Sequence, residues 1–102
     1  MEPTEPPAEP VTIKRDMVVG NRNGVHTRPA ALIVRTANKY PKVELLVAKG
    51  SEQVNAKSIM GLMMLAAGNG SKLHFIATGA SEQVQSLLDE LQKLFDSRFN
   101  EE

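Results

Sequence analysis

Residues 11–37 read VTIKRDMVVGNRNGVHTRPAALIVRTA and contain the two periodicities that decide the fold class. Apolar and polar side chains alternate over residues 11–19, which predicts a half-buried strand. The glycines and asparagines of residues 20–24 then predict a turn. Apolar residues next recur at intervals of three and four, which predicts an amphipathic helix with Pro29 in its first turn. The apolar positions of that helix are Ala30, Ile33, Val34 and Ala37.

Three further strands are predicted downstream of this helix. Residues 43–48 and 53–57 have the composition of two strands, and residues 49–52 between them predict a hairpin turn. Residues 73–78 alternate in the same way and predict a fourth strand.

Two further helices complete the predicted order. Ser58 is expected to cap a helix over residues 58–67, and Ser81 to cap the last helix. The last helix has a long apolar stripe, formed by Val84, Leu87, Leu88, Leu91, Leu94 and Phe95. The resulting order, βαββαβα, predicts a two-layer α+β sandwich with the helices on one face of a mainly antiparallel sheet.

Residues 1–10, MEPTEPPAEP, are rich in proline and glutamate and offer nothing to bury, so we expect an extended, solvated tail. The alternative is a docking peptide for a partner. Residues 11–102 are expected to form one domain, because 102 residues are too few for two ordinary ones.

The composition argues against several classes of function. Twelve basic and 12 acidic residues give a formal net charge of zero, whereas general binding to nucleic acid or a membrane surface needs a cationic excess. The chain has no cysteine, so disulfides, thiolate metal sites and thiol nucleophiles are excluded. No apolar run approaches the roughly 20 residues of a membrane span, and no signal pattern opens the chain. We therefore expect a soluble, cytoplasmic protein without membrane insertion.

His26 is the candidate functional residue, because it falls just before the first predicted helix. Backbone amides of a first helical turn lack helical partners, and the helix dipole favours an anion there. Neutral imidazole is a good nucleophile, and Arg28 offers a planar fork of donors to phosphate oxygens. Phosphoryl transfer mostly requires positioning and charge stabilisation, which these residues supply. The alternative is that both are ordinary surface residues.

Residues 24–30, GVHTRPA, resemble the active-site motif G-x-H-[TA]-R-P-A of HPr, the histidine-phosphocarrier family of the phosphoenolpyruvate-dependent phosphotransferase system. A second block, KSIMGLM at residues 57–63, resembles the regulatory-serine helix of that family, at nearly the family separation. The resemblance extends from about Lys14 to the end of the chain. It implies an open-faced β-sandwich, in which three helices cover one face of a four-stranded antiparallel sheet.

The resemblance also implies a role for each matched residue. His26 would accept a phosphoryl group on Nδ1 from phospho-enzyme I and pass it to an enzyme IIA. Arg28 matches the arginine that assists transfer, and Thr27 would donate its backbone amide. Such a protein carries a covalent phosphohistidine but is not a stand-alone enzyme. We expect a monomer with no cofactor and no metal.

Ser58 matches the serine that HPr kinase/phosphorylase modifies in organisms that have that enzyme, and its local alternative is a plain capping role. The docking surface of the family is formed by the first two helices around the histidine. The matching positions here are Ala31, Leu32, Arg35, Ile59, Met60 and Met63. The alternative for the methionines is that they fill the core.

Other functions remain open at this point. Residues 94–102, LFDSRFNEE, resemble the Phe-rich acidic ending of nitrogen-related carriers, which form a regulatory relay without sugar transport. A module without catalysis, acting through phospho-Ser58, is a third hypothesis, although such relatives lack the histidine. An unrelated ligand-binding α+β sandwich is a fourth. His74, in the middle of a strand, is interpreted as a surface residue.

Overall fold

The sheet has four antiparallel strands in the order β1-β4-β2-β3. In the computed structural model, which describes residues 9–101, the strands are β1 (Val11–Val18), β2 (Glu44–Lys49), β3 (Glu52–Asn55) and β4 (Lys72–Gly79). Strand β4 pairs with β1 along its whole length and with β2 on its other side. The predicted tail at residues 1–10 lies outside the described residues, apart from Glu9 and Pro10.

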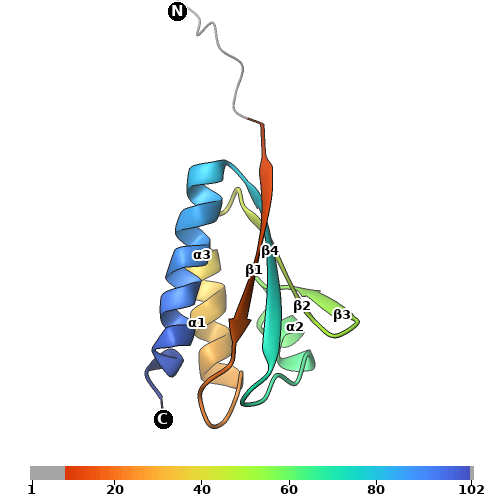
Figure 1. Ribbon diagram of the computed structural model, residues 1–102, viewed down its shortest axis with the longest axis vertical. Helices are drawn as coiled ribbons and strands as arrows, with labels where there is room; N and C mark the ends of the chain where they lie inside the picture. The colour runs from red at the N-terminus through yellow and green to blue at the C-terminus, as the bar shows by residue number, and fades with distance from the viewer. Residues whose placement is uncertain (1–8, 102) are drawn as a thin grey trace, which may run out of the picture.

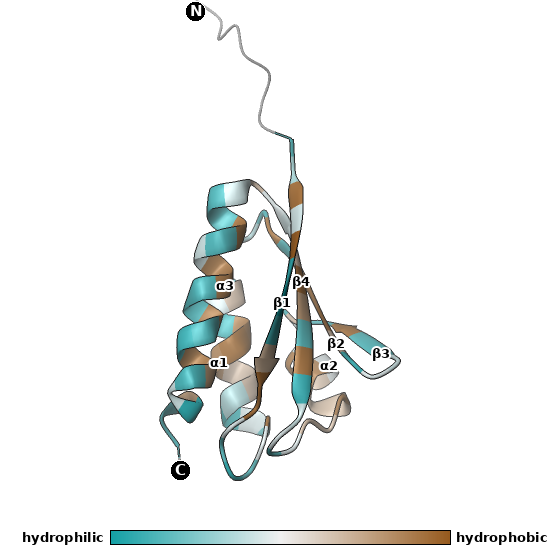
Figure 2. Cartoon of the chain, in the orientation of Figure 1, coloured by the Kyte–Doolittle hydropathy of each residue, from teal (hydrophilic) through white to brown (hydrophobic). Residues whose placement is uncertain are grey.

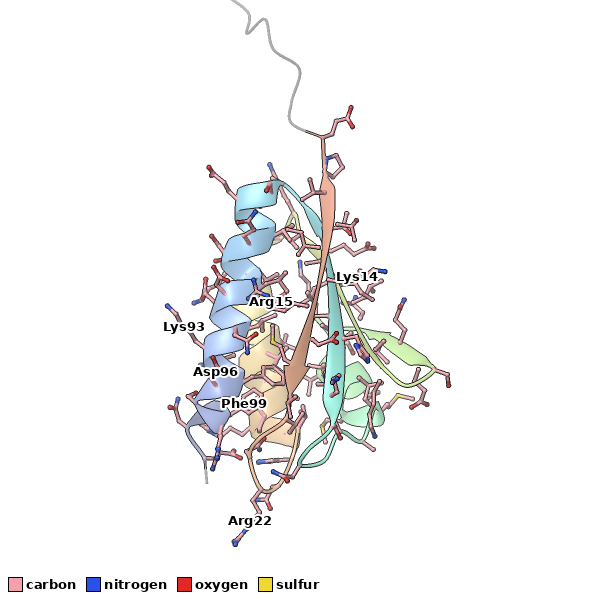
Figure 3. All side chains as sticks on the ribbon, viewed as in Figure 1. Lys14, Arg15, Arg22, Lys93, Asp96 and Phe99 are labelled. Carbon is pink, nitrogen blue, oxygen red and sulfur yellow. The ribbon has the colours of Figure 1, made fainter. Side chains whose placement is uncertain are left out.

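The alternation predicted from the sequence separates two faces of the sheet. In β4 the side chains of Leu73, Phe75 and Ala77 are buried, whereas His74 and Ile76 between them are partly exposed on the other face. In β1 the same rule is visible in Figure 3, where Arg15 points towards the long helix and Lys14 points away from it. The buried side chains of the strands and helices form one core.

Three helices cover the buried face: α1 (Thr27–Ala37), α2 (Ile59–Met64) and α3 (Ser81–Asp96), the last followed by a short turn of 3₁₀ type, η1 (Arg98–Asn100). Figure 1 shows α1 and α3 side by side and antiparallel, so that the end of α3 lies close to the beginning of α1. Figure 2 shows apolar residues of α3 along the side that faces the core and polar residues on its outer side. The predicted α+β open-faced sandwich with βαββαβα order is confirmed.

The hairpin and the second helix are shorter than the sequence predicted. Lys49 pairs with Glu52, so the turn consists of two residues rather than four, and β3 ends at Asn55. Helix α2 ends at Met64 instead of continuing to residue 67. The physical reason is at Ala66, whose φ of 50° is left-handed and incompatible with a continuing α-helix.

The predicted capping role of Ser81 is wrong. Ala80 is the N-cap of α3, and Ser81 is the first helical residue. Its hydroxyl instead accepts a hydrogen bond from the Gln85 side chain at 3.1 Å. No helix among residues 9–101 is long and apolar enough to cross a membrane.

Candidate functional site

His26 is the N-cap residue of α1, with the extended backbone conformation of φ −87° and ψ −165°. Its carbonyl accepts the first helical hydrogen bond, from the Ala30 amide at 3.0 Å. Its side chain makes no capping bond, so the imidazole does not occupy the amides of the first turn. The ring is therefore free to make other contacts, and 40% of the His26 side chain is exposed.

The loop before His26 is anchored through Gly24 and its neighbours. Gly24 has a φ of 71°, and a Cβ at this position would lie 2.4 Å from the Ala67 carbonyl oxygen. That same oxygen accepts the Val25 amide at 2.9 Å. The buried Asn21 side chain donates to the Gly24 carbonyl at 2.7 Å. Only glycine allows this close approach, which determines where α1 begins and where His26 lies.

The Glu101 carboxylate lies within hydrogen-bonding distance of the His26 ring. Both of its oxygens are 3.1 Å from His26 Nε2. Arg28 donates to Oε2 of the same carboxylate at 3.1 Å, and Asn21 Nδ2 donates to Oε1 at 3.0 Å. One carboxylate near the end of the chain thus contacts three polar side chains of the loop and helix start.

These contacts determine the protonation states at the site. The hydrogen bond from His26, reinforced by those from Asn21 and Arg28, holds the pKa of Glu101 below its usual value of 4.5, against the opposing effect of desolvation. Glu101 is therefore ionised at neutral pH and can only accept hydrogen bonds. It follows that Nε2 of His26 carries a proton, and that in the neutral ring Nδ1 has a free lone pair.

A short segment after α3, residues 97–101, brings Glu101 to this position, and we call it the C-terminal turn. Phe99 is fully buried and packs edge-on against Phe95, with ring centroids 4.8 Å apart. Figure 3 places Phe99 at the end of α3. Arg28 donates to the Phe99 backbone carbonyl at 2.6 Å as well as to the Glu101 carboxylate. The arginine side chain therefore binds both a backbone atom and a side chain of the C-terminal turn.

Helix α2 presents an apolar surface next to this site. Leu62 and Leu65 are buried, whereas Met60 is 74% exposed. The exposed apolar side chains of α2 are Ile59, Met60, Met63 and Met64. Together they line a shallow apolar depression, which we call the α2 surface. The structure thus places Met60 and Met63 outside the core, contrary to the core-filling alternative.

The other predicted docking residues lie on α1. Thr27 directs its hydroxyl at the Met63 sulfur, 3.9 Å away, so the beginning of α1 adjoins the α2 surface. Arg35 is exposed, Ala31 is partly exposed, and Leu32 is partly buried against the core. Leu32 contributes to packing, and the docking role of these three α1 positions stays a prediction.

Ser58 is the N-cap of α2, as the sequence predicted. Its Oγ accepts the Gly61 amide at 2.9 Å. A Cβ on Gly61 would lie 3.3 Å from that oxygen, so the glycine permits the close approach. The capping interpretation of Ser58 is therefore confirmed, and its phosphorylation stays a prediction.

Asn21, Phe99 and Glu101 were not predicted as site residues. Glu101 is 75 residues from His26 in the chain, and no local periodicity connects the two. The one related signal in the sequence was the acidic, Phe-containing ending of the chain, which resembles the ending of nitrogen-related carriers. That resemblance did not indicate a contact with His26. His74 lies on the open face of the sheet, as predicted, with Nδ1 2.6 Å from Asp16.

Comparison with known proteins gives the same family from sequence and structure. The family model described as PTS HPr component phosphorylation site matches residues 13–97. The phosphocarrier protein HPr of Treponema pallidum is 44% identical over 82 residues, covering 80% of this chain and 90% of the relative. The crystal structure of HPr-C-His from Thermoanaerobacter tengcongensis superposes with a TM-score of 0.76 at 38% identity, covering 93% of this chain and 99% of the other.

The Bacillus subtilis protein Crh, described as a catabolite repression protein whose crystal structure is a domain-swapped dimer, is 38% identical with a TM-score of 0.65. The alignment covers 76% of this chain and 85% of Crh. Proteins of this family are phosphocarriers and not stand-alone enzymes. From the family model, the sequence relatives and the fold together, the chain belongs to the HPr family of phosphocarriers of the phosphotransferase system.

Proposed function

We propose that this chain accepts a phosphoryl group on Nδ1 of His26 from phospho-enzyme I and passes it to an enzyme IIA. The observation that carries the proposal is the position of the His26 ring, at the N-terminus of α1 with its Nε2 bonded to Glu101 at 3.1 Å. This arrangement leaves the Nδ1 lone pair as the nucleophile. The amides of Thr27 and Arg28, in the first turn of α1, have no i−4 helical carbonyl and are suited to bind phosphoryl oxygens.

Each transfer replaces one bond to phosphorus by another and requires no metal or cofactor. The Nδ1 lone pair attacks phosphorus and forms the N–P bond, while the bond from phosphorus to the enzyme I side chain breaks and its electron pair stays on that side chain. The Nε2 proton remains on the ring. In the second transfer an acceptor side chain of the enzyme IIA attacks phosphorus, and Nδ1 regains its lone pair. Arg28 supplies positive charge to the phosphoryl oxygens throughout.

Labelling with enzyme I and phosphoenolpyruvate tests this proposal. We expect an acid-labile, base-stable phosphoprotein that is absent in His26→Ala. The matched control is His74→Ala, which removes the other histidine from the open face of the sheet and should label normally. Labelling that persists in His26→Ala, or that disappears in His74→Ala, would contradict the assignment.

We also propose that enzyme I and the enzyme IIA dock on the α2 surface together with the exposed side of α1. The support is physical: four large apolar side chains are exposed on a six-residue helix beside His26. Exposed apolar patches of this kind mark interaction sites, and methionine adapts to several partners. Sequential docking of two partners on one surface is what a carrier requires.

Ser58 is proposed as a regulatory site for HPr kinase/phosphorylase. It begins the helix that forms the α2 surface, so a phosphate of charge about −1.5 to −2 would lie at its edge. An apolar contact closing over that charge has to desolvate it, which opposes docking.

The nitrogen-related branch remains the second candidate, on the acidic ending of the chain. In the structure, Phe99 completes the core and Glu101 contacts His26, so this ending has a role in either branch. Because this ending does not distinguish the two branches, the sugar branch stays our first proposal. Comparing phosphoryl transfer to enzyme IIA proteins of both branches decides between them. A cytoplasmic location and a monomeric state are part of the proposal, and sedimentation at micromolar concentration tests the latter.

A further inference from the structure

Glu101 is not among the residues that the family motifs identify, yet it makes the largest set of polar contacts at His26. Its carboxylate bonds to His26, Arg28 and Asn21 at 3.0–3.1 Å. Only 17% of the Glu101 side chain is exposed, against 40% for His26. The carboxylate thus lies on the inner side of the ring, between the ring and the buried Asn21.

The backbone that carries Glu101 is unusual. Arg98, Phe99 and Asn100 all have φ values between 54° and 56°, and none of them is glycine. A left-handed φ is unfavourable for a residue with a side chain, because its Cβ lies too close to the following carbonyl oxygen. The conformation persists because Phe99 is fully buried and its carbonyl accepts a hydrogen bond from Arg28 at 2.6 Å. Core packing therefore forces the chain to reverse and return Glu101 to His26.

The chemistry of a carboxylate determines what this contact does. Because Glu101 can only accept hydrogen bonds, the ring must direct a protonated nitrogen at it, and that nitrogen is Nε2. The contact fixes both the orientation of the ring and its tautomer. Carboxylates that orient metal-binding histidines act in the same way, and their loss typically costs 10–100-fold in activity.

We propose that Glu101 is a positioning residue for phosphoryl acceptance: it keeps the proton of neutral His26 on Nε2 and so leaves Nδ1 unprotonated as the nucleophile. This inference rests on the proposed phosphorylation of His26. When the phosphoryl group arrives on Nδ1, its oxygens compete with Glu101 for Arg28, and Asn21 and Nε2 remain as partners of the carboxylate.

The second histidine provides an internal reference for the test. His74 bonds to Asp16 through Nδ1 at 2.6 Å, so its neutral ring should carry the proton on Nδ1, opposite to His26. We expect ¹⁵N NMR of the imidazoles at about pH 8.5, where imidazole is neutral, to show these two different tautomers in the full chain. In Glu101→Ala the His26 signals should change to an exchanging mixture, whereas the His74 signals should not move.

The kinetic test is a single-turnover transfer from phospho-enzyme I to Glu101→Ala and Glu101→Gln. We expect the rate to fall about 10-fold or more, with enzyme I affinity changed less than the rate. Asp96→Asn is the matched control, because it removes one exposed negative charge at the same end of α3 without contacting His26. Its rate should equal that of the unmodified chain.

The outcomes separate this inference from the proposed function. If the unmodified chain is not phosphorylated at His26, the proposed function fails. If it is phosphorylated and Glu101→Ala transfers equally fast or faster, Glu101 is not a positioning residue. A slower Glu101→Ala whose His26 keeps its Nε2 proton also overturns the inference, because the loss then comes from a disturbed C-terminal turn and not from the tautomer. A fall in rate with an altered tautomer supports it.

Discussion

His26 becomes a candidate nucleophile through contacts with individual residues, and Gly24 shows how narrow those requirements are. A Cβ at Gly24 would lie 2.4 Å from the Ala67 oxygen and 2.8 Å from Gly68 Cα. Both are backbone atoms and cannot move away as a flexible side chain could. The position of His26, two residues later, therefore depends on a hydrogen atom at Gly24.

We predict that Gly24→Ala lowers the free energy of unfolding by about 1–3 kcal/mol and also slows phosphorylation of His26, because the loop has to shift. Gly50→Ala is the matched control. Gly50 has a similar φ of 60°, but nothing lies within 4 Å of the place that a Cβ would occupy, so this variant has the backbone strain without the clash. Urea denaturation measures both variants. Equal losses in the two would show that the contact with Ala67 costs nothing.

Arg28 has a structural contact with the C-terminal turn and a proposed contact with the phosphoryl group, so its removal should affect both. We predict that Arg28→Ala slows transfer by about 10–100-fold, the range expected for a hydrogen bond to a charged group. It should also loosen the C-terminal turn, because the Phe99 carbonyl loses its partner. Arg28→Lys should restore only part of the rate, since a point charge cannot replace the planar fork. Single-turnover kinetics beside calorimetric affinity tests this, and a full rate in Arg28→Ala would contradict it.

At the scale of the element, the stability of helix α2 depends on its N-cap and on its contacts with the core. Six residues are too few for a stable isolated helix, so the Ser58 cap and the burial of Leu62 have to maintain it. The same shortness leaves most of its apolar side chains exposed. One short helix therefore combines a structural cap with the α2 surface.

We predict opposite behaviour for two substitutions at Ser58. Ser58→Asp should keep near-normal stability, because aspartate is an equally good N-cap, but it should weaken enzyme I binding by placing a charge at the α2 surface. Ser58→Ala should lose about 1 kcal/mol of stability and retain binding. Thermal melts and calorimetric titration on the same samples measure both properties. Unchanged affinity in Ser58→Asp would show that Ser58 lies outside the interface.

The α2 surface can be tested without changing the cap. We predict that Met60→Glu weakens enzyme I binding at least 10-fold, since Met60 is the most exposed apolar side chain of the helix. Val18→Glu is the control, because Val18 is also an exposed apolar residue but lies at the end of β1. Titration calorimetry should show normal affinity for Val18→Glu, and a normal affinity for Met60→Glu would exclude Met60 from the interface.

At the scale of the whole molecule, side-chain contacts join both ends of α1 to the C-terminal part of the chain. The C-terminal turn contacts the beginning of α1, and the residues after α1 contact the interior of α3. Tyr40 donates its hydroxyl to Glu90, which also pairs with Lys39 at 2.9 Å. The hydrogen bond raises the pKa of Tyr40 above 10.0, and chiefly the same bond lowers the pKa of Glu90 below 4.5.

The directions of the two pKa shifts predict a pH range over which the contribution of the Tyr40–Glu90 pair to the free energy of unfolding stays constant. The contribution of Glu90 is present above its ordinary pKa and is lost as pH falls through the lowered value. The contribution of Tyr40 is present below its ordinary pKa and is lost as pH rises through the raised value. Tyr40→Phe should therefore lower stability between these limits and remove the alkaline part of the dependence.

The measurement is unambiguous because the chain has one tyrosine and no tryptophan. Ultraviolet titration of the phenol should give a pKa above 10.0 in the unmodified chain, and Glu90→Gln should move it back towards that value. A phenol that titrates identically in both proteins would contradict the proposed cause.

For the molecule as a whole, local patterns in the sequence determined the order and type of the helices and strands. Alternation and three–four spacing depend on residues a few positions apart, so they predicted the strands, the helices and the buried stripe of α3. They also placed His26 at a helix start and Ser58 at a cap. They failed where geometry rather than periodicity decides: Ala66 ends α2 through its φ of 50°, and Ala80, not Ser81, is the N-cap of α3.

Only the tertiary structure decided which distant residues complete the site. The strand order and the antiparallel packing of α1 against α3 bring the end of the chain to the beginning of α1 (Figure 1). Burial of Phe99 then reverses the backbone and directs Glu101 at Nε2. A hydrogen bond across 75 residues leaves no mark in local sequence, because it depends on core packing that the chain acquires only when the whole domain has folded.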